Sequence, residues 1–304
     1  MRGRAAGGWL LVALAAAGCG AAGAGRRLVV ADSARINARA TRLAATLARP
    51  DSGKDRERPL ALWVVPVGLS EISGLALTAD QRLLAHDDER GAVSEIDYRR
   101  GVVTKQFLLG KPHTVHADFE GITVAGDKIF LLASNGILYE FKEGGTGERV
   151  DYTVHDTHLG KECEFEGVAF DPAIGSLLLA CKHVFSKALQ NFLVIYRWKL
   201  EPGDSGQLSQ LTVPLDQATG SNGWKAIHPS DITIDPLNGN YVIIASQQKA
   251  LIEITPAGVV LLSRPLPGDH DMAEGVAITR DSILIISDES AKRPAVVTLY
   301  RWPL

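Results

Sequence analysis

The sequence predicts an all-β protein, a β-propeller of five four-stranded blades that spans residues 60–304. Three observations predict this fold. One short signature recurs five times, each copy is followed by further strand-like runs, and a strand-like run without a partner precedes the first copy. Four-strand repeats of about 45 residues are typical of propeller blades.

The signature is a polar residue, a spacer, Ser or Glu, usually Gly, and then alternating apolar positions. Its copies occupy residues 71–76, 118–123, 164–169, 228–233 and 272–277. They start 47, 46, 64 and 44 residues apart. Because alternation with a period of two indicates a strand, each signature predicts the innermost strand of one blade.

Turn residues such as Asp171-Pro172 and Asn238-Gly239 separate each signature from a second strand. Second strands are predicted at residues 82–85, 129–133, 177–180, 241–245 and 283–286. Third strands are predicted at residues 93–98, 138–141, 192–200, 251–254 and 296–302. A fourth strand follows in four units, for example at residues 102–109 and 259–264, but the last unit lacks one.

Residues 61–68 are predicted to supply the missing strand as the outer strand of the last blade. Such closure joins the two ends of the domain and protects the sheet edges. The 64-residue third unit leaves six blades as an alternative, although insertions at residues 185–191 and 216–224 explain its length. A β-sandwich or several small β-domains are the competing architectures.

Residues 1–19 are predicted to be a lipoprotein-type signal peptide. Arg2 and Arg4 precede an apolar run at residues 9–17, and the following Ala-Ala-Gly-Cys sequence resembles a bacterial lipobox, which ends in an acylated cysteine. Ordinary signal cleavage near residues 15–17 is the alternative. We therefore expect lipidation at Cys19 and a location in the bacterial cell envelope, anchored to a membrane and facing the periplasm or the outside.

Residues 20–59 are predicted to be a tether that contains one helix-compatible piece at residues 36–49. No second apolar run approaches the ~18 residues needed to span a bilayer. Hydrophobic residues make up 46% of the chain and the formal net charge is −3, which fits a packed domain and gives no reason to expect a nucleic-acid partner. We expect a monomer.

Equivalent signature positions are expected to form two rings at one opening of the central channel. The inner ring contains Ser73, Glu120, Glu166, Ser230 and Glu274. The outer ring, two residues earlier, contains Glu71, Asp118, Glu164, His228 and Met272. With a period of two, both rings point to the same face of their strands. The glycines that follow are expected to permit close backbone approach at the crowded inner strands.

Gathered carboxylates repel one another, and a divalent cation relieves that repulsion. Calcium accepts about six to eight oxygen ligands in loose geometry, which suits a mixed set of Glu, Asp and Ser. The predicted calcium ligands are Glu71, Asp118, Glu120, Glu164, Glu166 and Glu274. In the alternative interpretation, each Glu accepts hydrogen bonds from backbone amides of the neighbouring blade and holds no metal.

Further polar residues are expected around the same opening and could bind a ligand. They are Asp88, Glu89, His116, Lys161, Lys182, His228, Asp288 and Glu289. His113 with His116, and His155 with His158, could suit zinc or copper, but they lie in loops, and solvated histidines are the preferred interpretation. Cys163 and Cys181 flank one hairpin almost symmetrically, so they form either a disulfide or two buried thiols.

The chain resembles the SdiA-regulated family of bacterial envelope proteins, among the phytase-like and esterase-like propellers. The resemblance rests on Glu-Ile-Ser-Gly at residues 71–74, Asp-Phe-Glu-Gly at residues 118–121, Asp88-Glu89 and Asp288-Glu289. It implies a calcium-associated propeller with no securely assigned reaction. The chain departs from the pattern at His228, Ser230 and Met272, so neither ring is fully acidic.

These observations favour a secreted or lipid-anchored, calcium-associated propeller that acts as a binding module for an envelope ligand or protein. The alternative is a calcium-dependent phytase-like or esterase-like hydrolase, since metal-bound water can attack phosphoesters. A third interpretation is a rigid spacer for envelope assembly. The chain has no Gly-x-Ser-x-Gly, His-Glu-x-x-His or phosphate-loop motif, so whether it is an enzyme stays open.

Overall fold

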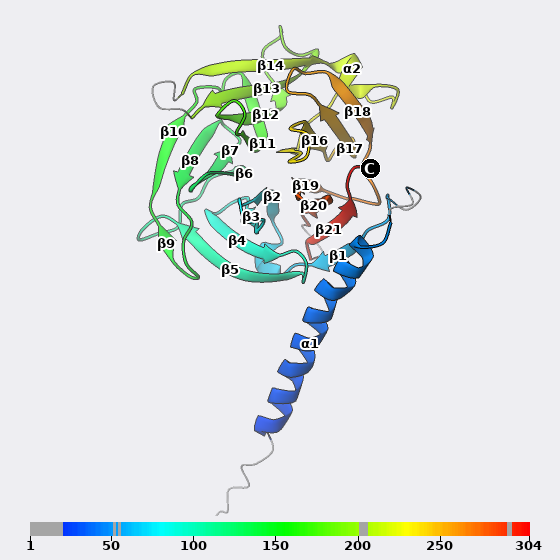
Figure 1. The fold of residues 1–304 in the computed structure, drawn as a ribbon. Helices are drawn as coiled ribbons and strands as arrows, with labels where there is room; N and C mark the ends of the chain where they lie inside the picture. Colours follow the sequence, from blue (N-terminus) through cyan, green and yellow to red (C-terminus); the bar gives the residue numbers. More distant parts are fainter. Residues whose placement is uncertain (1–20, 51–52, 54–55, 201–205, 291–293) are drawn as a thin grey trace, which may run out of the picture.

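The computed structural model describes residues 21–50, 53, 56–200, 206–290 and 294–304, and it is a five-bladed β-propeller (Figure 1). Blade one contains β2 (Ile72–Leu77), β3 (Leu83–Asp87), β4 (Ala92–Asp97) and β5 (Val102–Leu109). Blade two contains β6 (Phe119–Ala125), β7 (Lys128–Ala133), β8 (Ile137–Phe141) and β10 (Tyr152–Asp156). Blade three contains β11 (Cys163–Asp171), β12 (Ser176–Val184), β13 (Phe192–Lys199) and β14 (Leu208–Pro214).

Blade four contains β15 (Asp231–Ile234), β16 (Tyr241–Ala245), β17 (Ala250–Ile254) and β18 (Val260–Pro265). Blade five contains β19 (Ala273–Ile278), β20 (Ile283–Asp288), β21 (Val296–Arg301) and, from the other end of the domain, β1 (Ala61–Val64). The short strand β9 (Arg149–Val150) adds to β5 in parallel. The predicted fold, with five blades and closure by the N-terminal strand, is confirmed.

The closing strand is shorter than the predicted run of residues 61–68. Strand β1 pairs with β21 only as far as Val64, and a 3-10 helix, η1, spans Val67–Leu69. Pro66 has no backbone N–H to donate to a ladder, and its carbonyl accepts from Leu69 N at 2.8 Å. The length of the third unit is explained by the loop between β12 and β13 and by helix α2 (Leu215–Thr219).

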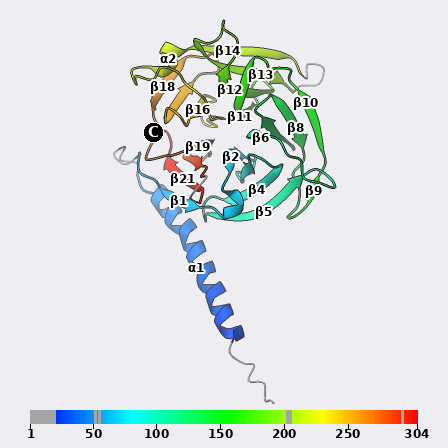
Figure 2. The same ribbon diagram turned by 180° about the vertical axis from the view of Figure 1, so that it is seen from behind.

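Apolar side chains fill the spaces between neighbouring blades. Each of five buried clusters combines side chains from two successive blades. Between blades three and four, for example, Ile195 packs in the same cluster as Tyr241, whose hydroxyl donates to Asp171 at 2.6 Å. Each buried aliphatic or aromatic side chain contributes roughly 1.5–3 kcal/mol to stability. The blades form a disc around the inner strands (Figure 2).

Helix α1 (Ala21–Leu47) projects from the rim of the disc beside β1 (Figures 1 and 2). It begins earlier and ends earlier than the predicted piece at residues 36–49. Its C-terminal end is docked, because Leu43 is 3% exposed in the cluster between blades five and one, and Arg301 donates to the carbonyl of Thr46 at 2.8 Å. In the described part of the chain, no helix is long and apolar enough to cross a membrane. The predicted signal peptide and Cys19 lie outside the described residues.

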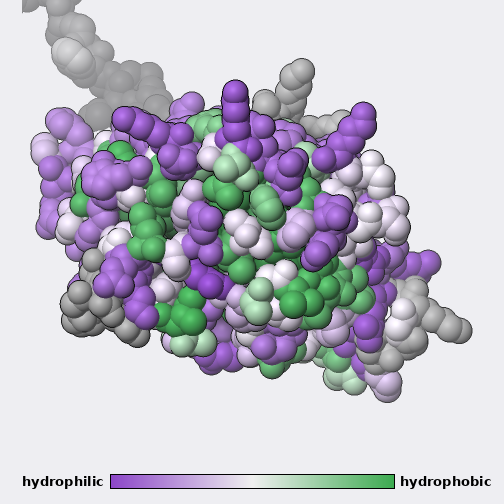
Figure 3. Space-filling view, turned by 90° about the horizontal axis from the view of Figure 1, so that it is seen from above, coloured by the Kyte–Doolittle hydropathy of each residue, from purple (hydrophilic) through white to green (hydrophobic). Residues whose placement is uncertain are grey.

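The rim of the propeller carries scattered hydrophobic side chains. Seen from the side of β14 and α2, hydrophobic groups are interrupted by hydrophilic ones (Figure 3). The exposed large side chains include Leu208 on β14 and Leu261 on β18. Isolated apolar residues of this kind are normal on soluble surfaces and by themselves indicate no binding site.

Candidate functional site

The inner strands contain β-bulges at the predicted ring positions. The ladder between β6 and β7 skips Glu120, that between β19 and β20 skips Glu274, and that between β2 and β3 skips Ser73. A shift also occurs in β11 between Phe165 and Val168, the stretch that holds Glu166. A bulge changes the direction of the extra side chain, so these side chains do not follow the regular alternation that would point them into the packed faces of the blades.

Carboxylates from blades one, two and five approach one another at this opening. We call this set the acidic sector: Glu71, Asp88, Asp118, Glu120, Glu274 and Glu289. Burial, then the charge of Asp118, raises the pKa of Glu120 to about 8, with Glu274 and Asp88 adding to the effect. Burial, then the charge of Glu289, raises the pKa of Glu274 to about 7. The acids gathered at one mouth therefore disfavour one another's charged forms.

One group of three carboxylates could hold a metal ion. Glu71, Asp87 and Asp88 place one oxygen atom each within 4.8 Å of the others, the sole such group among the described residues. Burial, followed by Glu71, Glu289 and Asp87, raises the pKa of Asp88 to about 6. Its Oδ1 is buried and has no hydrogen-bond partner. Carboxylate oxygens and an orphaned buried acceptor fit a hard cation.

Most of the six predicted calcium ligands lie outside this three-carboxylate group. Only Glu71 belongs to the three-carboxylate group. Asp118 accepts a hydrogen bond from Ser134 at 2.6 Å, and Glu166 forms an ion pair with Lys182. Sequence reasoning missed Asp87, although it adjoins Asp88 at the end of β3. Asp87 is also bound by Arg90, whose Nη2 lies 2.6 Å from Oδ2.

Polar side chains of blades three and four have hydrogen-bond or ion-pair partners at the same opening. We call Glu166, Lys182, His228, Ser230 and Asp231 the compensated sector. Glu166 is 5% exposed and pairs with Lys182, whose backbone carbonyl lies 3.0 Å from Nδ1 of His228. Ser230 donates to the carbonyl of Ala273 in blade five at 2.6 Å. Lys182, His228 and Ser230 line a cavity of about 390 Å³.

Asp231 stands where the other four signatures have glycine. A Cβ on Gly121 would lie 2.8 Å from Val168 N, and one on Gly167 would lie 2.7 Å from the Cα of Asp231, so the inner strands touch and these glycines are required. Asp231 is 1% exposed and accepts from Val276 N at 2.7 Å and from Ile232 N at 2.8 Å. Its carboxylate thus links blade four to blade five.

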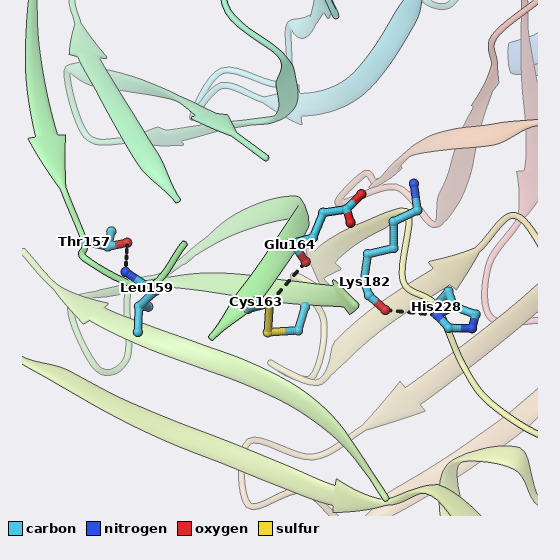
Figure 4. The surroundings of a disulfide bond; sticks show 7 residues. Thr157, Leu159, Cys163, Glu164, Lys182 and His228 are labelled. Atoms are coloured by element: carbon cyan, nitrogen blue, oxygen red, sulfur yellow. Dashed lines mark hydrogen bonds between the residues drawn. A yellow bond between two sulfur atoms is a disulfide. The ribbon is translucent and has the colours of Figure 1, made fainter. Parts of the chain in front are cut away.

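A disulfide joins Cys163 of β11 to Cys181 of β12, with 5.7 Å between their Cα atoms (Figure 4). It lies directly beside two mouth residues, because Glu164 and Lys182 are the next residues in their strands. Their side chains extend from the same side of the hairpin (Figure 4). The crosslink therefore fixes the part of blade three that carries Lys182.

The other predicted ligand-binding residues do not converge. His116 and Lys161 are exposed in loops that lead into inner strands, and Glu89 is exposed between β3 and β4. His155 lies on the outer strand β10, 3.0 Å from Glu140, because the loop after β8 continues into that strand. His270 is buried in blade five against Asp288, at 2.6 Å. Among the described residues the histidines thus form no shared metal site.

Comparison with known proteins supports the fold and part of the resemblance. Residues 204–301 match the family model described as SdiA-regulated. The matched segment contains β14 of blade three, helix α2, blade four and all of blade five except β1, so it includes His228, Asp231 and Glu274 but not the three-carboxylate group. No curated protein matches the chain in sequence.

Two solved structures show the same fold at low identity. A PQQ-bound aldose sugar dehydrogenase from Streptomyces coelicolor is 14% identical, with a TM-score of 0.51 over 79% of this chain and 98% of the other. A glutaminyl cyclase from Myxococcus xanthus is 13% identical, with a TM-score of 0.50 over 80% of this chain and 94% of the other. At this identity the likeness to these structures concerns the fold alone.

Proposed function

We propose that the protein is a calcium-associated binding module of the bacterial cell envelope, which presents its channel mouth to an envelope ligand or protein. The observation that carries this proposal is the group Glu71, Asp87 and Asp88, with Oδ1 of Asp88 buried and unpartnered. Calcium would be held by these carboxylates and would offset their mutual repulsion. Arg90 already neutralises part of Asp87, so Glu71 and Asp88 would supply most of the charge.

The ligand would be bound in the cavity whose lining includes Lys182, His228 and Lys249. The same lining holds the acids Glu166, Asp271 and Glu274, and the hydroxyls of Ser230 and Ser246. This mixed set suits a polar ligand that carries a carboxylate or phosphate group together with hydrogen-bond donors. Because Glu166 pairs with Lys182, an anionic ligand would have to compete with that ion pair. We therefore expect moderate affinity and a requirement for the neighbouring cation.

Calcium removal tests the metal part of the proposal. A ligand that binds only the folded state stabilises it, so we expect EGTA to lower the melting temperature and added calcium to restore it. An Asp88→Asn/Glu71→Gln double variant should lose this dependence, whereas Asp127→Asn, on an exposed turn of blade two, should keep it. Equal melting temperatures with calcium and with EGTA would contradict the proposal.

The envelope location rests on the signal-like residues 1–19 and on the Cys163–Cys181 disulfide, since disulfides persist in oxidising compartments. If Cys19 is acylated, helix α1 of 27 residues would hold the disc about 40 Å from the anchor. Palmitate labelling and membrane fractionation of the parent and of Cys19→Ala test this. Label on the variant, or no change in its fractionation, would contradict lipidation at Cys19.

One observation favours hydrolase activity as a second candidate. Glu120, with a pKa of about 8, would be protonated at neutral pH beside the carboxylate of Asp118, an arrangement that general acid catalysis can use. Phosphomonoesters and simple esters should then be hydrolysed in the presence of calcium, and Glu120→Gln should abolish the activity. Equal rates for the variant and the parent would reject this candidate.

A further inference from the structure

A second cavity lies where the inner strands end, at the opposite end of the channel from the acidic sector. Its volume is about 310 Å³, within the range of small-molecule pockets, which begins at about 300 Å³. We call it the lower cavity. Each of β2, β6, β11, β15 and β19 lines it with residues from the end of the strand and from the following turn. Since Glu71 precedes β2 and Leu77 ends it, the lower cavity lies roughly 20 Å along the strand from the proposed calcium group.

One equivalent position of the five inner strands forms an apolar ring in the lower cavity. It is the residue directly after each signature, namely Leu77, Val124, Phe170, Ile234 and Ile278. The first four of these side chains are only half-buried, so the blades leave part of their apolar surface uncovered at this end. Uncovered apolar surface inside a concave site favours binding of a hydrocarbon group.

A few polar groups of the lower cavity have no protein partner. Within the described part of the chain, the hydroxyls of Thr123 and Thr233 and the guanidinium of Arg280 make no hydrogen bond or ion pair. The backbone N of Arg280 donates to Oε1 of Gln81 at 2.8 Å, which joins the turns of blades five and one. The Nε2 group of Gln81 then adds another donor to the lining. The free groups can all donate hydrogen bonds, so they suit a ligand that accepts them.

The lining of the lower cavity carries a single charge. Among the described residues that line it, Arg280 is the one charged group, and none is Asp or Glu. Four acids in neighbouring turns each have a Lys or Arg partner at hydrogen-bond distance. They are Asp80, Asp127, Glu143 and Asp281. These acids therefore leave the guanidinium of Arg280 available to a ligand.

The remaining acids at this end of the blades lie outside the lining. Asp171 accepts from the hydroxyl of Tyr241 at 2.6 Å, and Asp235 accepts from Nε1 of Trp302 at 2.8 Å. Both carboxylates are buried. Two further acids belong to residues 201–205, which are outside the described residues and connect the outer strands β13 and β14, whereas the lower cavity is lined from the inner strands.

We infer that the lower cavity binds an aliphatic carboxylate, whose charged group contacts Arg280 while its hydrocarbon chain lies against Leu77 and Phe170. The paired N–H groups of a guanidinium match the two oxygens of a carboxylate. This chemistry is shared by a free fatty acid and by the C-terminal apolar residue of a peptide. The site is separate from the proposed calcium group and from the cavity that contains Lys182, so each can fail without the others.

Binding of octanoate to the whole protein tests this inference, measured by calorimetry in EGTA so that calcium has no part in the result. We expect octanoate to bind at least tenfold more tightly than acetate, which lacks the chain, and than octanamide, which lacks the charge. Arg280→Gln should weaken octanoate binding about tenfold or more, because a charge-assisted hydrogen bond is lost. The matched substitution Arg100→Gln, which removes an exposed arginine paired with Asp97, should leave it unchanged.

A second variant tests the lower cavity without altering Arg280. Ala79 is exposed in the turn after β2 and lines the lower cavity, so Ala79→Glu should fold and add a competing carboxylate there. It should weaken octanoate binding by a similar factor. No binding to the parent, equal binding of acetate or octanamide, or unchanged affinity in either variant would overturn the inference.

Lys249→Gln separates the lower cavity from the cavity at the other mouth. Lys249 is exposed and lines that other cavity, so this variant should bind octanoate as tightly as the parent does. Octanoate binding that falls in Lys249→Gln but not in Arg280→Gln would overturn the inference while the proposed function stands.

An acetylated dipeptide with a C-terminal leucine separates the two sources of the carboxylate. Tighter binding of this dipeptide than of octanoate assigns the lower cavity to the end of a peptide chain, and the reverse assigns it to a free fatty acid. Binding of either compound should be lost in Arg280→Gln.

Discussion

The acidic and compensated sectors differ in how their carboxylates are paired, although both are built from the same repeated signature. In the compensated sector, Glu166 has Lys182 and Asp231 has backbone N–H groups of blades four and five. Burial raises the pKa of Asp231 despite these hydrogen bonds, whereas in the acidic sector neighbouring acids add to burial in raising the pKa values of Glu120 and Glu274. Acid-to-neutral substitutions should therefore destabilise one sector and stabilise the other.

Removing the cation of the compensated sector should have the largest effect. Lys182→Met leaves Glu166, which is 5% exposed, without its ion-pair partner, and it also removes a charge that lowers the pKa values of Glu120 and Glu274. We expect a loss of about 3 kcal/mol in the free energy of unfolding, measured in urea at neutral pH. Adding Glu166→Gln should recover much of it. If Lys182→Met alone is as stable as the parent, the ion pair between Glu166 and Lys182 does not contribute to stability.

Asp231→Ala should be the next most damaging change. It leaves Val276 N and Ile232 N without their acceptor at the centre of the propeller, where Asp231 is 1% exposed. The expected loss is about 2 kcal/mol, read from the same urea titration. Asp127→Ala is the control, because Asp127 is exposed and pairs only across the surface with Lys142. Equal losses in the two variants would mean that Asp231 does not hold the blades together.

The sequence is sufficient to predict the fold because the signature and its strands repeat along the chain. The period gives the blade count, and the missing strand of the last unit predicts the pairing of β1 with β21. Asp231 is visible in the sequence as a departure from the glycine column, but its acceptor role depends on the approach of Val276 from another blade. The distance between Val276 N and the Asp231 carboxylate is set by the packing of the two blades and not by any local sequence pattern.

The predicted site is only partly reproduced, for a physical reason. Superposing the signatures treats the inner strands as regular, whereas bulges at Ser73, Glu120 and Glu274 change which side chains can meet. The three-carboxylate group combines Glu71 from the start of one strand with Asp87 and Asp88 from the end of its neighbour. Aligning the five signatures compares one position across different blades. It therefore cannot reveal a group formed by residues from two strands of the same blade.

Glu120→Gln should stabilise the protein, in contrast to Lys182→Met and Asp231→Ala. The pKa of Glu120 is raised to about 8 in the folded state, so the parent loses stability as pH rises from the ordinary value of 4.5 through about 8. The neutral amide avoids that loss. In EGTA, the variant should exceed the parent by about 1 kcal/mol near pH 9 and match it near pH 4. A difference that does not depend on pH would contradict the assignment.

The smallest effect should change sign with calcium. In EGTA, Asp88→Asn removes one of three neighbouring carboxylates and relieves repulsion from Glu71, so we expect a gain below about 1 kcal/mol in the free energy of unfolding. With saturating calcium the same variant should be less stable than the parent, because only the parent would gain binding free energy. Thermal unfolding of both proteins under both conditions measures this crossing. If Asp88→Asn is more stable than the parent by the same amount in EGTA and in calcium, the carboxylates of the acidic sector repel one another but bind no calcium. Calcium would then bind elsewhere on the protein or not at all.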